Sequence, residues 1–238
     1  MNRQKENYIY GFHAVDQIIR YAPHRARKLF IARSKDHQKI EEQARRAGIS
    51  CEIVDRDFLK KRFQVENEAQ GIVLVAAAFE YVPLEELLEI PAHKLVILDT
   101  WQDAVNIGRA ARAALCFGAS GLVICTDRSA EINSVAEKAA VGALARLPVA
   151  RVGNLAMALK KIKEQNFFVY GADEAGQVSL EKCDFAAKTA IVIGQEGAGL
   201  RELTKKNCDL IVNIPMANKD ICLNAADTAL IFLYELSK

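Results

Sequence analysis

The first 80 residues alternate short apolar blocks with charged segments, which predicts small helices and strands in turn. Phe12, Val15, Ile18 and Ile19 recur at helical spacing and predict a helix over residues 12–21. The elements predicted after it are a strand at 29–31, a charged helix at 36–48 that ends in a glycine, a strand at 51–54, a basic turn at 56–62 with Asp55 as its cap, and an apolar strand at 71–79. Residues 1–78 are therefore expected to form a small α/β domain.

Residues 79–92 interrupt this alternation. They contain Pro83, Pro91 and the acidic run 84–89, and proline between periodic segments is typical of loops. They are predicted to be a linker, with the second domain at 93–238.

From Lys94 onward apolar runs and helical patterns follow one another regularly. The predicted strands are 95–98, 121–125, 147–152, 167–170, 190–193 and 210–214, and the predicted helices are 107–117, 134–145, 155–164, 200–207 and 225–236. Buried strands that alternate with helices predict an α/β fold with a parallel sheet covered on both faces. Ligands of such sheets bind beyond the carboxyl ends of the strands, so the loops at those ends are the candidates for function.

The composition is that of an ordinary globular protein, since 51% of the 238 residues are hydrophobic and 26% are charged. No apolar run approaches the roughly 18 residues that a membrane-spanning helix needs, and the polar first residues do not match a signal peptide. The six cysteines form no Cys-x-x-Cys pair and do not cluster with the four histidines, which disfavours a zinc site or a disulfide framework. We expect a cytoplasmic protein with free thiols and no bound metal.

The net charge of +2 conceals an asymmetry along the chain. Residues 1–66 hold 15 Lys/Arg and 9 Asp/Glu, whereas residues 67–238 hold 17 and 21. A basic first quarter joined to a mildly acidic remainder favours two modules, of which the first faces an anionic partner. A solvated face of lysines and arginines is the alternative.

The loop after strand 95–98 is the first of three that contain candidate chemistry. Asn106 is placed to cap the next helix, Gly108 permits close backbone approach, and Arg112 lies about one helical turn further on. Taken alone, this loop favours an ordinary capped helix with a solvent-facing arginine.

The second loop, 194–200, has the spacing Gly-x-x-Gly-x-Gly between a strand and a helix. This differs from the Gly-x-Gly-x-x-Gly of a dinucleotide-binding fold and comes late in the chain, so a Rossmann NAD site is disfavoured. Three glycines within six residues indicate positive φ angles or backbone packed against a ligand, with a plain tight turn as the alternative. The third loop, 214–224, has an ordinary composition and ends in Asn224, which is placed to cap the last helix.

Together, the three loops resemble the motifs of the SpoU (TrmH-type) family of RNA ribose 2'-O-methyltransferases, which belongs to the SPOUT superfamily. The matching residues are Asn106, Gly108 and Arg112 in the first motif, Gly194, Glu196, Gly197 and Gly199 in the second, and Ile214, Pro215, Met216, Leu223 and Asn224 in the third. The resemblance covers residues 94–238 and is greatest to the bacterial 23S rRNA guanosine 2'-O-methyltransferases. Residues 1–78 are similar, less specifically, to the L30e-like RNA substrate-binding domain of those members.

The resemblance implies a parallel-sheet domain with a deep trefoil knot, a feature that is nearly absent from other proteins. It also implies S-adenosylmethionine as the cofactor, held in the knot mainly by backbone groups, and a homodimer whose active site is completed at the subunit interface. The residues carried over as cofactor contacts are Gly194, Gln195, Gly197, Ile214, Met216 and Leu223.

The implied reaction is in-line methyl transfer from a sulfonium to a ribose 2'-hydroxyl, for which the protein has to align the oxygen and favour its alkoxide character. Because a guanidinium is almost always protonated, Arg112 is assigned to the adjacent phosphate and the developing oxyanion, and the proton is left to a phosphate oxygen or a water. Asn106 and Asn224 are expected to position the ribose and the loops. Glu196 is expected to orient Arg112 or Asn106.

The chain departs from the family pattern at four places. Ala104 stands where the family often has Pro, Asn218 where Gly is usual, Cys222 where Ser is usual, and Asp227 where a small residue is common. Asn tolerates positive φ angles, whereas a thiol is a weaker hydrogen-bond partner than a hydroxyl. If the usual Ser contacts the ribose, the chain is expected to be slower or to act on a different nucleotide.

The basic residues of the first domain are the candidates for phosphate contacts with structured RNA, contacts that carry little sequence information. They are Arg25, Arg27, Lys28, Lys39, Arg45, Arg46, Lys60, Lys61 and Arg62. The predicted function is ribose 2'-O-methylation of RNA, with a guanosine of 23S rRNA as the expected target. A tRNA ribose methyltransferase, a catalytically weak RNA-binding or ribosome-assembly factor that retains the fold, and a nucleotide-cofactor enzyme on an unknotted sheet are the alternatives.

Overall fold

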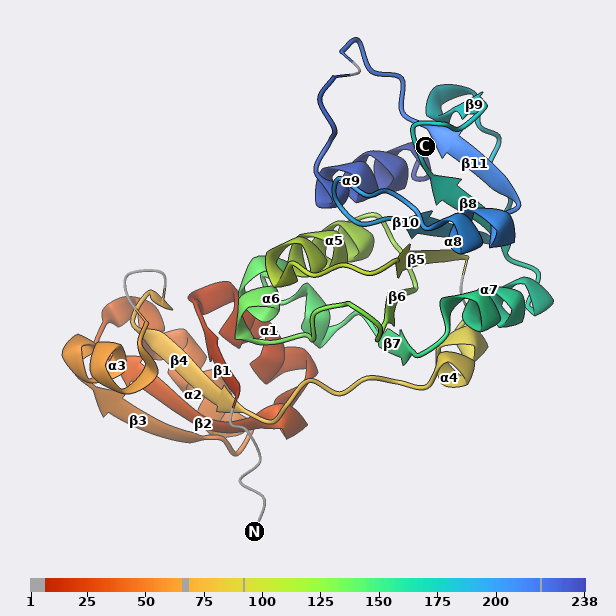
Figure 1. Ribbon diagram of the computed structural model, residues 1–238. Helices are drawn as coiled ribbons and strands as arrows, with labels where there is room; N and C mark the ends of the chain where they lie inside the picture. The colour runs from red at the N-terminus through yellow and green to blue at the C-terminus, as the bar shows by residue number, and fades with distance from the viewer. Residues whose placement is uncertain (1–6, 66–68, 92, 219) are drawn as a thin grey trace. The chain divides into compact units, whose positions relative to one another are not determined.

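The computed structural model describes residues 7–65, 69–91, 93–218 and 220–238, which form two compact units (Figure 1). The first unit contains the described part of Met1–Glu80 together with Ile132–Arg146, and the second contains that of Tyr81–Glu131 and Leu147–Lys238. Among these residues no helix combines the length and the apolarity that crossing a bilayer requires.

The described residues of the first unit form a four-stranded sheet of order β1-β4-β2-β3. Its strands are β1 (Asn7–Tyr10), β2 (Ala26–Ala32), β3 (Ser50–Val54) and β4 (Ile72–Ala76). The strands β1 and β2 pair antiparallel with β4, and β3 runs parallel to β2. Pairing with β4 buries Ile9 completely, a long-range contact that the sequence pattern around β1 did not reveal.

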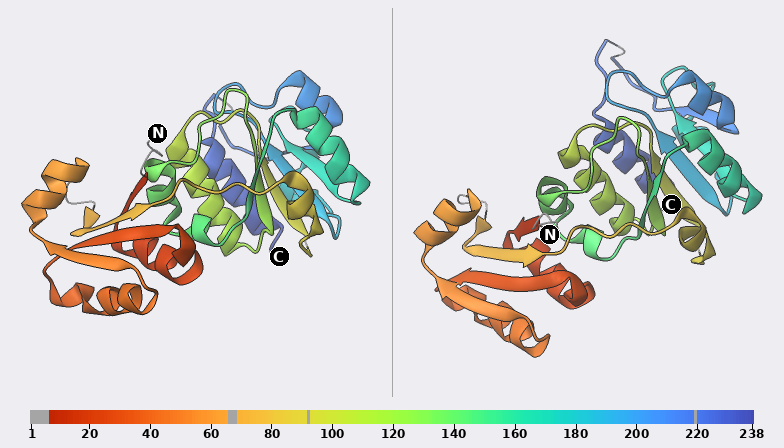
Figure 2. Two further views of the ribbon diagram at one scale, coloured as in Figure 1. Left: turned by 90° about the horizontal axis from the view of Figure 1, so that it is seen from below. Right: turned by 60° about the horizontal axis from the view of Figure 1, so that its bottom comes forward.

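Helices cover both faces of this sheet (Figure 2). One face packs against α1 (Phe12–Tyr21) and α2 (Gln38–Arg46), and the opposite face packs against α3 (Arg56–Phe63). Two short 3-10 turns, η1 (Pro23–Arg25) and η2 (Lys35–His37), connect them to the strands. Asp55 precedes α3 as predicted, but its side chain makes no capping hydrogen bond.

The segment Ile132–Arg146 packs with the first unit although it lies between two strands of the second. It contains α6 (Ser134–Ala140) and the turn η4 (Ala143–Ala145). Glu137 of α6 is 2% exposed and pairs with Arg25 at 2.5 Å inside this unit. The expected limits of 1–78 and 93–238 did not include this excursion, because a helical pattern does not tell which sheet the helix will cover.

The second unit is built on a seven-stranded sheet in which, among the described residues, every pair of neighbouring strands is parallel. Its strands, in spatial order, are β7 (Val149–Val152), β6 (Gly121–Cys125), β5 (Lys94–Leu98), β10 (Thr189–Ile193), β8 (Phe168–Ala172), β11 (Leu210–Asn213) and β9 (Val178–Ser179). The predicted α/β class with a parallel sheet is confirmed. The two-residue strand β9 was not predicted, because so short a segment has no recognisable period.

Helices cover both faces of this sheet as well (Figures 1 and 2). On one side lie α4 (Leu84–Glu89), α7 (Leu155–Glu164) and α8 (Glu202–Asn207), and on the other α5 (Ala104–Cys116) packs against α9 (Ala225–Glu235); the turn η5 (Leu180–Lys182) follows β9. The helix α4 falls in the stretch 79–92 that was expected to be a linker. It is part of the fold, because Leu84 and Leu87 are buried in the core of the second unit.

Candidate functional site

Three of the four predicted catalytic residues are brought together by the loops that follow β5, β10 and β11. The amide of Asn106 donates from Nδ2 to Glu196 Oε2 at 3.2 Å. The amide of Asn224 donates from Nδ2 to the same carboxylate oxygen at 3.1 Å and to Asn106 Oδ1 at 3.2 Å. These residues are up to 118 positions apart in the chain, so their meeting is a property of the fold. We refer to them as the Asn106–Glu196–Asn224 cluster.

The two asparagines reach the cluster from the first turns of two packed helices. Asn224 caps α9 as predicted, since its Oδ1 accepts from the Ala226 N–H at 2.8 Å. The prediction that Asn106 caps α5 is wrong: Asp103 does so, accepting from the Val105 N–H at 2.8 Å. Because the helix begins three residues earlier than expected, Asn106 sits inside its first turn, almost fully buried, and its side chain is free to bind Glu196.

Arg112, the fourth predicted catalytic residue, makes no hydrogen bond or ion pair with the cluster. It is exposed on α5, and within the described part of the chain no hydrogen bond or ion pair holds it. Of the two partners expected for Glu196, the carboxylate therefore binds Asn106 and not Arg112. The neighbouring Arg109 is engaged instead, in an ion pair of 2.5 Å with Asp227 of α9.

The glycine-rich loop that carries Glu196 is closed on itself. The N–H of Gln195 donates to the carbonyl of Gly199 at 3.2 Å, and the N–H of Gly199 donates back at 2.9 Å. The residue Gly199 has φ +66°, which favours glycine. A Cβ on Gly194 would lie 2.1 Å from the carbonyl carbon of Gly199, so the two ends of the loop touch only because no side chain stands there. The positive φ angles predicted from the glycine spacing are confirmed at Gly197 and Gly199.

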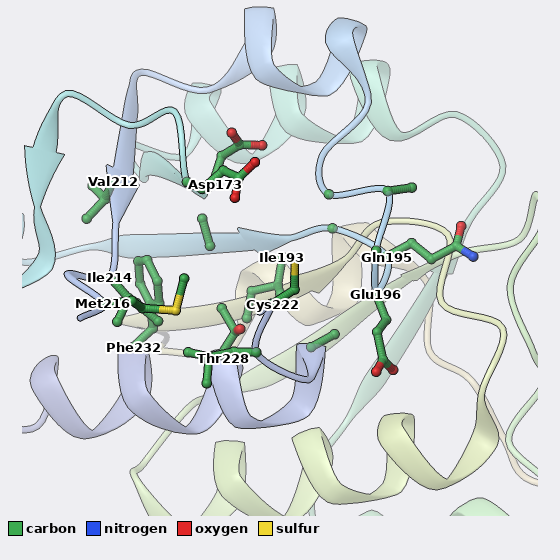
Figure 3. A pocket seen from close by; sticks show the side chains of 18 of the residues that line it. Asp173, Ile193, Gln195, Glu196, Val212, Ile214, Met216, Cys222, Thr228 and Phe232 are labelled. Carbon is green, nitrogen blue, oxygen red and sulfur yellow. The ribbon is translucent and has the colours of Figure 1, made fainter. Parts of the chain in front are cut away.

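A pocket of about 210 Å³ opens beside this loop (Figure 3). All six residues predicted to contact the cofactor line it, namely Gly194, Gln195, Gly197, Ile214, Met216 and Leu223. Figure 3 shows Asp173 on one side of the pocket, Thr228 of α9 on the other, and Glu196 turned away from the pocket toward α5.

The lining fits S-adenosylmethionine. Ile193, Ile214 and Phe232 supply apolar wall for a base and a thioether chain, while the glycine loop offers bare backbone to polar groups. The carboxylate of Glu174 supplies negative charge for a cationic ligand, whereas Asp173 is paired with Lys205, which also lines the pocket. The pocket therefore combines the contact types that this cofactor needs.

A second, smaller pocket of about 140 Å³ adjoins the first. It is lined by Trp101, Gln102, Asp103, Asn106, Gln195, Glu196 and Ala225. Gln195, Glu196 and Ala225 line both pockets, so Glu196 of the cluster lies where the two spaces meet, and Asn106 lines the smaller one.

Comparison with known proteins agrees with this geometry. The model of the SpoU rRNA Methylase family matches residues 93–234, and the model described as RNA 2'-O ribose methyltransferase substrate binding matches residues 8–82. The chain belongs to the SpoU rRNA methylase family. It is an RNA ribose 2'-O-methyltransferase that depends on S-adenosylmethionine.

Curated relatives and solved structures align with nearly the whole length of this chain. The "Putative TrmH family tRNA/rRNA methyltransferase YacO" of Bacillus subtilis is 34% identical, over 98% of this chain and 96% of its own. The "23S rRNA (guanosine-2'-O-)-methyltransferase RlmB" of Haemophilus influenzae is 30% identical, over 96% of each. The crystal structure of the SpoU methyltransferase AviRb from Streptomyces viridochromogenes has a TM-score of 0.83 and 26% identity, covering 99% of this chain and 90% of its own. A structure of AviRb with AdoMet shares this fold, with the same TM-score and 24% identity.

The four departures from the SpoU pattern have defined surroundings. Ala104 is the first residue of α5, and Cys222 is exposed and lines the larger pocket. Asn218 accepts a hydrogen bond from the Asp220 N–H at 2.8 Å, and Asp227 makes the ion pair with Arg109. None of these contacts involves the cluster itself.

Two acidic residues of the larger pocket are among those that the sequence analysis did not predict. Asp173 and Glu174 directly follow β8, and their position at the carboxyl end of a parallel strand is the signal that could have identified them. Asp173 also pairs with Lys205 of α8 at 2.9 Å, and this carboxylate raises the pKa of Lys205 above its usual value.

The nine basic residues proposed for RNA contact divide into three groups. Arg25 is 3% exposed and committed to Glu137, so it is not a surface contact for phosphate and that prediction is wrong. Three exposed or half-exposed residues have acidic partners: Lys28 with Glu52, Arg45 with Glu41, and Arg46 with Glu42. The remaining five are exposed and make no ion pair with any described residue; they are Arg27, Lys39, Lys60, Lys61 and Arg62.

The sequence analysis predicted free cysteines and no bound metal. All six cysteines are free thiols. Within the residues that the structure describes, no group of three or more His, Cys, Asp or Glu could hold a metal ion.

Proposed function

We propose that the chain methylates the ribose 2'-hydroxyl of a guanosine in 23S rRNA. The observation that carries the proposal is the hydrogen-bonded Asn106–Glu196–Asn224 cluster, whose Glu196 lines two adjoining pockets, one of which fits the cofactor. Relatives that align over nearly the full length of both chains are named for this reaction. The proposal also includes a cytoplasmic location and the trefoil knot, which is supported by membership of the SpoU family.

The larger pocket is the proposed cofactor site, with the six predicted contacts as its walls. When bound, S-adenosylmethionine supplies an activated methyl group on a sulfonium. The chain's own contribution is to fix the donor with the backbone of loop 194–200 and the apolar side chains Ile214, Met216 and Leu223, because alignment supplies much of the rate in such a displacement.

The smaller pocket is the proposed site of the acceptor nucleotide. In the cluster, Glu196 accepts from both amides, and the oxygen of each asparagine accepts from a neighbour, so the orientation of every amide is defined. Such a fixed network can hold a ribose hydroxyl without reorganising during the reaction. Asn106 and Asn224 are therefore proposed to position the ribose, and Glu196 to orient Asn106.

Arg112 is proposed to act in a homodimer. It shares the outer side of α5 with Val105, which is 41% exposed, and Leu230 and Tyr234 of the adjoining α9 are 43% and 52% exposed. Large apolar side chains gathered on two packed helices favour a protein interface. A second copy docked there would enclose Arg112, which could then bind the phosphate beside the reacting ribose and stabilise the developing oxyanion.

The first unit is proposed to hold structured RNA, in agreement with the substrate-binding family model over residues 8–82. Its exposed and unpaired basic side chains would contact phosphates, which makes RNA affinity strongly dependent on salt. The proposed functional limits are 1–78 for this domain and 93–238 for the methyltransferase domain.

The test is methylation of defined RNAs by the purified protein. We expect labelled S-adenosylmethionine to yield 2'-O-methylguanosine in 23S rRNA from a strain that lacks the gene, detected by mass spectrometry of nucleosides. Labelling confined to tRNA would replace the target with the tRNA alternative. Cofactor binding without methylation of any RNA would support the silent RNA-binding factor instead.

A further inference from the structure

The segment Asp99–Trp101, directly after β5, holds the beginning of the glycine-rich loop. The carbonyl of Ile193, the last residue before that loop, accepts from the Asp99 N–H at 2.9 Å and from the Trp101 indole Nε1–H at 3.0 Å. The Trp101 side chain is buried. Two donors on one carbonyl fix the point at which the loop leaves the sheet.

The side chain of the same Asp99 holds the other end of the loop. Its Oδ1 forms an ion pair of 2.7 Å with the guanidinium of Arg201, which directly follows the loop, but makes no hydrogen bond with any described residue. Its Oδ2 accepts a hydrogen bond from the hydroxyl of Thr204 at 2.7 Å. Asp99 therefore ties the loop's exit and the start of α8 to the same segment that holds the loop's entry.

Asp99 is completely buried, and it lines neither pocket. A buried carboxylate is costly unless it is paired and hydrogen-bonded, so its partners at the loop exit account for its presence. The backbone around it is also constrained: Thr100 has φ +62°, which is unusual for a β-branched residue, and its hydroxyl donates to the Asp99 carbonyl at 2.7 Å.

The segment 99–103 also leads into α5, which carries Asn106. One short stretch of chain thus sets the position of Asn106 and holds both ends of the loop that presents Glu196. A shift of the loop relative to this stretch would change the cofactor pocket and the Asn106–Glu196 hydrogen bond together.

We propose that Asp99 is a positioning residue for methyl transfer, which acts by clamping the glycine-rich loop through Arg201 and Thr204. The inference rests on the proposed role of this loop in holding the cofactor. The clamp acts through the loop and not by direct contact, since Asp99 lines neither pocket. The basic side chains proposed for the phosphate contacts with RNA belong to the other unit, so the clamp does not position them.

The test compares Asp99→Asn with a second hydrogen-bonded carboxylate in the same unit, Asp209, which is exposed. Asp209 accepts from the Val169 N–H at 2.8 Å and pairs with Lys163 at 2.7 Å, but it lines neither pocket and does not contact the loop. Asp209→Asn therefore controls for the loss of an anchoring carboxylate. For each variant we would measure the Kd of S-adenosylmethionine by calorimetry, the KM values for cofactor and RNA, kcat, and the melting temperature.

For Asp99→Asn we expect the Kd and the KM for the cofactor to rise about 10-fold or more, with the KM for RNA unchanged within about two-fold. Asp209→Asn should leave the cofactor Kd unchanged. Equal cofactor affinity in Asp99→Asn and the wild type would overturn the inference, and so would equal losses in both variants.

A second variant covers the case in which Asp99→Asn does not fold. Arg201 is 41% exposed, so Arg201→Gln is expected to fold and to weaken cofactor binding in the same direction, while Arg201→Lys restores it. A normal Kd in Arg201→Gln would refute the clamp. Because the Kd is measured without RNA, a failure of the proposed rRNA reaction in the wild type would be seen separately.

Discussion

Replacing Gly194 with alanine gives a sharp test of how the cofactor pocket is built. The new Cβ would lie 2.1 Å from the carbonyl carbon of Gly199, 2.2 Å from its oxygen and 2.4 Å from the Leu200 nitrogen, all of them backbone atoms. Ordinary contact begins at 3.4 Å, so the two ends of the loop have to separate by about 1.3 Å. Overpacking of this kind costs roughly 1–3 kcal/mol, and a displacement of about 1 Å at a reacting site costs on the order of 100-fold in rate.

We therefore expect Gly194→Ala to lower the affinity for S-adenosylmethionine by at least about 10-fold, measured by calorimetry, and to abolish most methyl transfer. The matched control is Gly118→Ala after α5. That glycine has φ +71°, and a Cβ added to it would meet no atom within 4 Å, so the substitution costs roughly 1–2 kcal/mol of stability through φ alone and leaves the pocket intact. Wild-type cofactor affinity in Gly194→Ala would refute the close loop packing on which the pocket depends.

Three further substitutions or treatments probe other parts of the molecule. Arg112→Ala should abolish methyl transfer and leave the calorimetric Kd for the cofactor within about two-fold; normal turnover would exclude the assigned role. Arg25→Ala leaves Glu137 buried without its partner and should lower the free energy of unfolding in urea by about 3–5 kcal/mol, so a change below about 1 kcal/mol would contradict the buried pair. Burial raises the pKa of Cys208 to about 12 from 9.0, so this thiol stays protonated at pH 9. Alkylation followed by mass spectrometry should therefore modify the exposed Cys116 and Cys222 before Cys208, and equal labelling of Cys208 and Cys222 would contradict the burial.

Local sequence patterns were sufficient to predict the bounds of those helices and strands that are strongly periodic. The helices at 12–21 and 155–164 have the predicted bounds, as does the strand at 121–125. The errors fall where tertiary contacts decide. The strand β1 exists because it pairs with β4, and the run 84–89 is helical and buries its leucines against the second unit. Neither partner is visible in a local window.

The candidate site was also predicted only in part: the sequence identified its motif residues but not the contacts between distant segments. Asn106, Glu196 and Asn224 were found because each occupies a fixed place in a motif, yet their mutual hydrogen bonds depend on three loops that only the folded sheet brings together. Asp99 was passed over because nothing in a sequence shows that a carboxylate will be fully buried against α8. Motif spacing identifies the residues that meet the ligand more readily than those that hold the motif in place.

The charge asymmetry along the chain illustrates why a count of basic residues does not locate an RNA-binding surface. Two arginines of α2 face glutamates one turn away, and pairs of this exposed kind are weak, but the glutamates remain to repel a phosphate. Near the end of α3, Lys60 and Lys61 are exposed and have no acidic partner among the described residues. A phosphate backbone can approach them without displacing a carboxylate, so α3 offers RNA more net attraction than α2 although both helices contribute basic residues to the same count.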